Sequence, residues 1–123
     1  MLNSLDTIPE MKTPALCEIW NWQGDTSILP YKFESVMNAV SAQAGLYTHT
    51  GLKQDYVMNE RFDPDGFFFL TYRSNAIGLT LAYRTDEHTF ELPFLVCVPG
   101  HRNKGVEKAL LALILQFCQR KGA

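Results

Sequence analysis

The sequence has 123 residues, a length that suits one domain built around one hydrophobic core. Hydrophobic residues make up 46% of the chain and charged residues 20%, a balance that excludes a disordered polypeptide. The net charge of -2 excludes a long-range attraction to the nucleic-acid backbone, so we predict no nucleic-acid partner and expect any anion site to be local.

The N-terminal residues do not have the pattern of a targeting signal or a membrane anchor. Asp6 and Glu10 interrupt this segment, and no apolar run reaches the length of a signal peptide or a membrane-spanning helix. We therefore expect a cytoplasmic protein without a membrane partner. The chain also contains no internal repeat or linker-like tract, so residues 1–123 are predicted to form a single domain.

The first predicted helix begins at Thr13, a residue suited to an N-cap, and Pro14 suits the first helical position. Apolar side chains then recur at helical spacing, and the helix is expected to end near Gly24. The residues of this apolar stripe are Leu16, Ile19 and Trp20.

A second helix is predicted to begin near Pro30 and to end at Gly45, because glycine suits the position after a helix. Between Leu46 and Asp65 the pattern is irregular, and it predicts a loop with one turn near residues 56–60. The apolar residues at helical spacing in the second helix are Phe33, Val36, Met37, Val40 and Ala44.

Three strands follow, separated by short polar turns, and they are expected to form an antiparallel meander. The first is an aromatic run that reads as a strand buried on both faces. Pro93 interrupts the third strand and cannot donate a hydrogen bond to the sheet, so it predicts a bulge or an unpaired position. The strands are expected at residues 67–72, 76–83 and 89–98, with a turn at Ser74–Asn75.

The most regular helical pattern runs from Lys104 to Arg120 and is followed by Gly122. The first amides of such a helix have no intrahelical partner and lie at the positive end of the helix dipole, where a phosphate can bind. Arg102 and Lys104 add cations there, and Gly105 permits a close approach of the backbone. The segment is therefore predicted to hold a diphosphate, the alternative being a basic loop that only caps a core helix.

The order of the elements and the motif Cys97-x-Pro99-x-x-Arg102-x-x-Gly105-Val106 resemble the GCN5-related N-acetyltransferase (GNAT) family. Phe62–Phe68 and Ile77–Gly78 also look like this family, especially its mycothiol-synthase-like branch. The resemblance implies an α/β (α+β) fold that consists of two N-terminal helices, a three-stranded antiparallel meander and a long C-terminal helix.

The resemblance also implies a cosubstrate, acetyl-CoA, and an amine acceptor. In the family, the strand before the motif pairs with the pantetheine arm of the coenzyme, and the amides of the motif bind its pyrophosphate. Carried over to this chain, the first two of the following residues serve the arm and the others serve the pyrophosphate: Cys97, Val98, Arg102, Asn103, Lys104, Gly105, Val106, Glu107 and Lys108.

Acetyl transfer requires a group that removes a proton from the attacking amine, and a strand carboxylate or an ordered water usually does so. Glu91 lies on the third predicted strand, upstream of the motif, and is the candidate catalytic residue. An exposed strand glutamate without a catalytic role is the alternative, and His88, in a predicted turn, is the second candidate base.

Two departures from the family pattern leave a second function open. Glu107 stands where the family prefers glycine or alanine, and its carboxylate would either repel a diphosphate or cap an empty helix end. The family continues with a further strand, helix and hairpin, whereas the sequence ends at Ala123, so we expect half of the usual fold to be absent. The alternative is a non-catalytic, shortened module that acts through self-association, such as a homodimer that rebuilds the cleft, or through a protein partner.

The remaining residues of chemical interest are expected to be structural. The cysteines and histidines are widely spaced and lack a metal-ligand pattern, so no metal is predicted and the cysteines are expected to be buried free thiols. Trp20 and Trp22 are assigned no role, because aromatic residues on amphipathic helices usually pack in the core rather than line an acceptor pocket. The widely spaced residues are Cys17, Cys97, Cys118, His49, His88 and His101.

Overall fold

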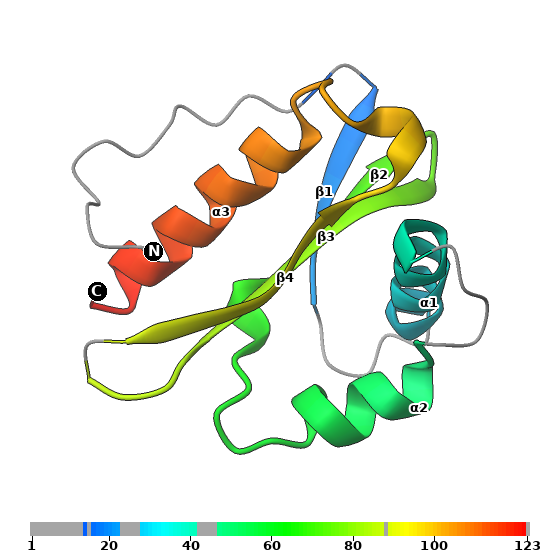
Figure 1. Cartoon of the computed structure of the whole chain (residues 1–123). Helices are drawn as coiled ribbons and strands as arrows, with labels where there is room; N and C mark the ends of the chain where they lie inside the picture. The colour runs from blue at the N-terminus through cyan, green and yellow to red at the C-terminus, as the bar shows by residue number, and fades with distance from the viewer. Residues whose placement is uncertain (1–13, 15, 23–27, 42–46, 88, 123) are drawn as a thin grey trace.

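The protein is described by a computed structural model that covers residues 14, 16–22, 28–41, 47–87 and 89–122. A four-stranded antiparallel sheet lies between two layers of helix, with α1 and α2 on one face and α3 on the other (Figure 1). The mixed α/β fold with an antiparallel meander and a long C-terminal helix is therefore confirmed. None of the described helices is long and apolar enough to cross a bilayer.

The three predicted strands are confirmed as neighbours in the order β2, β3, β4. Arg73 and Ser74 connect β2 to β3 with φ values of 50° and 69°, the left-handed pair that a tight hairpin requires, so the turn lies one residue before its predicted place. The strands span Phe67–Tyr72 (β2), Asn75–Arg84 (β3) and Phe90–Cys97 (β4).

The helix predicted to follow Thr13 is wrong, because its central residues form the edge strand β1 (Cys17–Asn21). This strand pairs antiparallel with β2, and its residues alternate between the two faces of the sheet: Ile19 packs toward α3 and Trp20 toward α1. Pairing with the otherwise unpaired edge of β2 outweighs the helical spacing of three apolar residues. Thr13 and Gly24, the predicted helix ends, lie outside the described residues.

The bulge predicted at Pro93 is confirmed by the pairing of β3 with β4. Leu81 is opposite Phe94, but Tyr83 is opposite Glu91, so two residues of β4 face one residue of β3. Leu92 and Pro93 form this bulge. It changes the course of β4 between its two halves, with Glu91 on one side and the strand end at Cys97 on the other.

The helices follow the sequence pattern closely except after residue 46. Helix α1 (Ile28–Ser41) confirms the second predicted helix, although its predicted end at Gly45 lies outside the described residues. The predicted loop is instead partly helical, with α2 (His49–Leu52) and a π-helical turn (Lys53–Val57). Helix α3 (Val106–Arg120) confirms the last predicted helix and begins two residues after Lys104.

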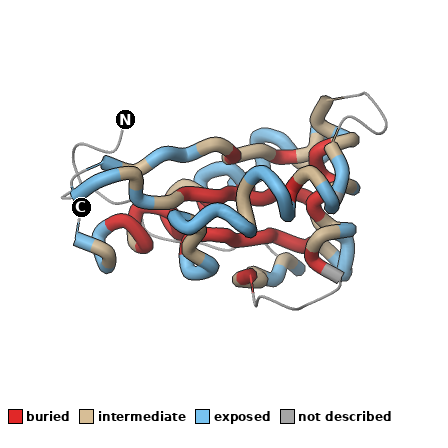
Figure 2. Tube along the Cα trace, turned by 90° about the horizontal axis from the view of Figure 1, so that it is seen from below, coloured by how far each residue is buried: buried red, intermediate tan, exposed pale blue. Residues whose placement is uncertain are grey.

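The core consists of a layer on each face of the sheet, and Figure 2 shows the buried residues concentrated along the central strands. Phe67 and Phe69 of β2 pack toward α1, while Phe68 and Leu70 pack toward α3, so β2 is buried on both faces as predicted. Trp22 stacks on Phe67 with ring centroids 5.1 Å apart. This contact confirms the core interpretation of Trp22.

Gly78 of β3 sets the distance between the sheet and the first turn of α3. A Cβ at this position would lie 2.9 Å from Cγ1 of Val106 and 3.0 Å from the carbonyl oxygen of Val96. Because only glycine fits there, α3 begins directly against β3 and β4. The N-terminus of α3 is thereby fixed beside the end of β4.

Candidate functional site

The segment between β4 and α3 turns the chain sharply through two left-handed residues. Pro99–His101 form a single 3-10 turn. Asn103 and Gly105 then adopt φ values of 64° and 88°, and Gly105 is the N-cap of α3. Because glycine adopts this conformation without strain and asparagine tolerates it, the chain can change direction and enter the helix within this short segment.

The first turn of α3 presents backbone N–H groups that no side chain caps. Gly105 has no side chain, and its carbonyl accepts the first intrahelical hydrogen bond from the amide of Ala109, at 3.0 Å. The amides of residues 106–108 precede that bond, and within the described residues no side chain accepts from them. They lie at the positive end of a 15-residue helix.

Cationic side chains surround this turn. Arg102, Lys104 and Lys108 are exposed, and none of them forms an ion pair with another described residue. Arg102 Nε donates to the carbonyl oxygen of Cys97 at 3.4 Å, a long contact that holds the guanidinium over the end of β4. The predicted basic residues are therefore brought together at one end of the sheet.

Glu107 lies in the same first turn and is exposed, but it does not cap the helix. It forms no hydrogen bond within the part of the chain that the structure describes. Burial is the main cause that raises the pKa of the Cys97 thiol; the charge of Glu107 raises it further and that of Arg102 lowers it. Both charged groups therefore lie close to the end of β4.

The backbone N–H and C=O groups of Cys97 and Val98 point to opposite sides of the chain. The amide of Val98 donates to the carbonyl of Ile77 at 2.9 Å, so it belongs to the ladder between β3 and β4. Backbone groups of a strand alternate in direction, so the N–H and C=O of Cys97 point to the outer edge of β4, where Arg102 reaches the carbonyl. Leu95 points the same way, and within the described residues no strand pairs with this edge.

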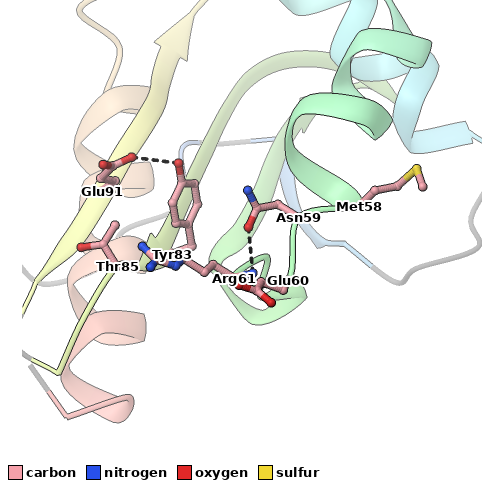
Figure 3. A pocket seen from close by; sticks show the side chains of 7 residues that line it. All are labelled: Met58, Asn59, Glu60, Arg61, Tyr83, Thr85 and Glu91. Carbon is pink, nitrogen blue, oxygen red and sulfur yellow. Dashed lines mark hydrogen bonds between the residues drawn. The ribbon is translucent and has the colours of Figure 1, made fainter.

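Glu91 lies before the bulge of β4, on the face of the sheet that carries α1 and α2. Its Oε2 accepts a hydrogen bond of 2.8 Å from the hydroxyl of Tyr83 on β3 (Figure 3). Burial is the first cause that raises the pKa of Tyr83 to about 12; the hydrogen bond and charge of Glu91 add to it, and Arg61 opposes it. Tyr83 therefore stays protonated near neutral pH and holds the carboxylate by one oxygen.

A cavity of about 610 Å³ opens beside Glu91. One wall comes from the segment that follows the π-helical turn, and the other comes from the ends of β3 and β4 (Figure 3). Trp20 and Trp22 do not line it, and His88 lies outside the described residues. The lining residues are Met58, Asn59, Glu60, Arg61, Tyr83, Thr85 and Glu91.

Sequence reasoning identified Glu91 but missed the other residues of this cavity. Tyr83 was readable in principle, because two strands of an antiparallel hairpin place it opposite Glu91 once the bulge at Pro93 is counted. Residues 58–61 gave no comparable signal, since their place depends on how the segment after α2 packs.

A second cavity, of about 430 Å³, lies between the ends of β1–β3 and the start of α3. It includes His101, whose ring lies 5.2 Å from that of Tyr72, and Lys104. It shares no residue with the cavity at Glu91. Among the described residues no group of three or more metal-ligating side chains is present, and the three cysteines are unpaired.

Strand β4 thus connects the region of Glu91 to the basic turn before α3. Glu91 and Cys97 are six positions apart, which corresponds to at most about 20 Å, since the bulge between them bends the strand. The basic turn lies beyond one end and the carboxylate lies near the other. This arrangement suits an elongated ligand that is anchored by an anionic group at α3 and reacts near Glu91.

Both the sequence and the fold of the chain match those of known proteins. The sequence model of the acetyltransferase (GNAT) family matches residues 33–123, a span that includes both ends of β4 and all of α3. No curated protein matches the chain.

Several solved structures share the fold at low sequence identity. Ard1 from Thermoplasma volcanium is 18% identical, with a TM-score of 0.63 over 87% of this chain and 66% of its own. A GCN5-related N-acetyltransferase from Sphaerobacter thermophilus is 13% identical, with a TM-score of 0.68 over 90% of this chain and 35% of its own. An acetyltransferase of the GNAT family from Staphylococcus aureus Mu50 is 18% identical, with a TM-score of 0.61 over 85% of this chain and 68% of its own. The chain therefore spans less than two thirds of the length of the Thermoplasma volcanium and Sphaerobacter thermophilus proteins.

Proposed function

The chain belongs to the acetyltransferase (GNAT) family, and on that premise we propose that it transfers an acetyl group from acetyl-CoA to an amine. The observation that carries the proposal concerns the first turn of α3, at the end of β4: among the residues that the structure describes, no side chain caps it and the cations around it form no ion pair. A diphosphate bound there accepts several N–H hydrogen bonds at the positive end of the helix. The residues proposed to hold it are those of the segment Arg102–Lys108.

The charge of this segment supports binding in spite of Glu107. Arg102, Lys104 and Lys108 bring three positive charges. Glu107 removes one, which leaves a net charge of +2 for the two ionised esters of a diphosphate. Glu107 therefore weakens the attraction without reversing it, and since it is exposed it can turn toward solvent.

The outer edge of β4 supports a place for the pantetheine arm. Cys97 and Leu95 each direct one N–H and one C=O outward, and an arm that contains amides can pair with them as a strand would. Val98 is not proposed to pair, because its amide is engaged by Ile77. Arg102 leaves the carbonyl of Cys97 when it turns to the diphosphate.

Glu91 is proposed to accept the proton of the amine. The amine then forms the new bond to the acetyl carbon, the carbon–sulfur bond of the thioester breaks, and the departing thiolate takes up a proton from Glu91 or water. Tyr83 holds one carboxylate oxygen and leaves the other for the amine. Both residues lie on the wall of the cavity that would admit the acceptor.

Calorimetry with acetyl-CoA tests the proposal. Arg102→Ala removes an exposed cation that can bind a phosphate in a bidentate manner, and it is expected to weaken binding by about tenfold. Arg120→Ala, at the opposite end of α3, is the matched control and should bind as the native chain does. The proposal would be refuted by the absence of any heat of binding at millimolar acetyl-CoA, or by an Arg102→Ala variant that binds as tightly as the native chain.

A second function is favoured by one observation, the outer edge of β4, with which no described strand pairs. An exposed strand edge can pair with a partner strand, including that of a second copy of the chain. In this alternative the domain is a non-catalytic module that self-associates or binds a protein. Sedimentation tests the first form of this alternative, since a strictly monomeric chain contradicts self-association.

A further inference from the structure

The cavity at Glu91 contains charged groups of both signs. Glu91 and Glu60 are acidic, and Arg61 is basic. Within the described residues the guanidinium of Arg61 forms no ion pair and no hydrogen bond. Its charge nevertheless lowers the pKa of Tyr83, against the larger effects of burial and Glu91, so it lies near the Tyr83 phenol.

Arg61 is held in this position by the turn that carries it. Its backbone amide donates to Oδ1 of Asn59 at 2.9 Å, and the amide of Phe62 donates to the carbonyl of Asn59 at 3.0 Å. The ring of Phe62 then packs edge-on against Trp22 and Phe67, with centroids 6.2 Å and 6.1 Å away. The backbone of Arg61 is therefore anchored to the core, and only the side chain is exposed.

The side chains of the cavity lie around Tyr83. Its hydroxyl is bound to Glu91, and Figure 3 shows the side chain of Arg61 turned toward Tyr83, near the end of β3, and Thr85, which follows the strand. A carboxylate and a guanidinium thus flank one aromatic ring, and they do not pair with each other. Such a separated pair of charges suits a molecule that carries both an ammonium group and a carboxylate.

Resting on the proposed acetyl transfer, we propose that the acceptor is a small amino acid, whose amine faces Glu91 and whose carboxylate binds Arg61. The cavity of about 610 Å³ is open to solvent, and it has room for a small molecule that contacts both charged groups. A simple amine would satisfy Glu91 and leave Arg61 without a partner. A dicarboxylate would be repelled by Glu60 and Glu91, which leave the cavity with a net charge of -1.

The test compares amino acids with their amides, which keep the amine and remove the negative charge. The probes are glycine, β-alanine and 4-aminobutyrate, each beside its amide, so that the spacing of amine and carboxylate is also varied. For the best-fitting spacing we expect the acid to bind about tenfold more tightly than its amide, and to be acetylated in preference. Both binding and acetyl transfer are measured with the intact chain in the presence of acetyl-CoA.

Variants at the cavity wall assign the preference to Arg61. Arg61→Gln should abolish the preference for the acid and leave binding of the amide unchanged. Arg61→Lys should retain part of the preference, because the ammonium group keeps the positive charge but cannot form the two parallel hydrogen bonds of a guanidinium. Glu60→Gln is the matched control: it removes a neighbouring charge and should keep or increase the preference. Equal thermal unfolding of the variants shows that the fold is intact.

The outcomes separate this inference from the proposed function. Equal acetylation of acids and amides overturns the inference and leaves the acetyltransferase proposal standing. Acid binding that is lost in Arg61→Gln, without any acetyl transfer, supports the amino acid site and counts against the proposed reaction. Equal binding of acids and amides, or a preference that persists in Arg61→Gln, overturns the inference whether or not acetyl transfer occurs.

Discussion

Replacing Tyr83 by phenylalanine tests whether the contact between β3 and β4 at the cavity is formed as described. The substitution keeps the ring and removes the hydroxyl that donates to Glu91 at 2.8 Å. Since the pKa of Tyr83 is raised, first by burial and then by Glu91, the folded protein favours the neutral phenol. The stabilisation is therefore fully present below the ordinary pKa of 10.0 and is lost as the pH rises through about 12.

The pKa shift gives only an upper bound on the size of the effect, because burial contributes more to it than the contact with Glu91 does. A pKa that rises from 10.0 to about 12 corresponds to at most about 2.7 kcal/mol. Solvent screens the interaction, because Glu91 is exposed and Tyr83 only half-buried, which reduces the expected value to ~1 kcal/mol. Tyr83→Phe should thus lower the free energy of unfolding by ~1 kcal/mol near neutral pH, and the difference from the native chain should shrink above pH 10.0.

Urea unfolding of both chains across the alkaline range measures this difference. Phenolate absorbance gives a second readout, since the native chain should contain one group, absent from Tyr83→Phe, that titrates near 12. The reasoning would be refuted by a difference in unfolding free energy that stays constant with pH, or by a Tyr83 phenol that titrates at 10.0.

Three further predictions concern α3 and the basic turn. Gly78→Ala should cost about 1–3 kcal/mol of unfolding free energy in urea, because the new methyl group meets Val106, whereas Gly100→Ala, which meets nothing within 4 Å, should be neutral. Glu107→Ala should raise the calorimetric affinity for acetyl-CoA several-fold, and the gain should fade as salt is added; a loss of affinity would show that Glu107 assists binding. Arg102→Ala should not weaken binding of S-acetylpantetheine, which lacks the diphosphate, since the substitution only releases the carbonyl of Cys97; an equal loss for both ligands would contradict the assigned role.

The sequence was informative wherever a local pattern decides the structure. The aromatic run of β2, the proline of the bulge and the apolar spacing of α3 each depend on residues close in the chain, and each prediction was confirmed. The basic turn was also readable, because its glycine and cations stand directly before the helix that they serve. What these features share is a physical cause that acts within a few residues.

The misread elements depend on contacts between distant parts of the chain. β1 contains apolar residues at helical spacing, yet Trp20 lies opposite Phe69 because β2 needs a partner on that edge. An alternation was present as well, with Ile19 and Trp20 on opposite faces of the sheet, but five residues are too few to separate a strand from a helix turn. Arg61 could not be found for the same reason, since the packing of Phe62 against Trp22 and Phe67 determines where it lies.

The bulge bears on the choice between the two functions. Pro93 has no N–H, so β4 offers no donor at that position, and regular strand pairing along the outer edge is interrupted between the halves of the strand. A partner strand would need the full length of the edge, whereas a pantetheine arm needs only the part at Leu95 and Cys97. The interruption therefore disfavours edge-to-edge association and leaves Glu91, beyond the bulge, open to an acceptor. For this reason binding of acetyl-CoA, rather than self-association, is the property of β4 to measure first.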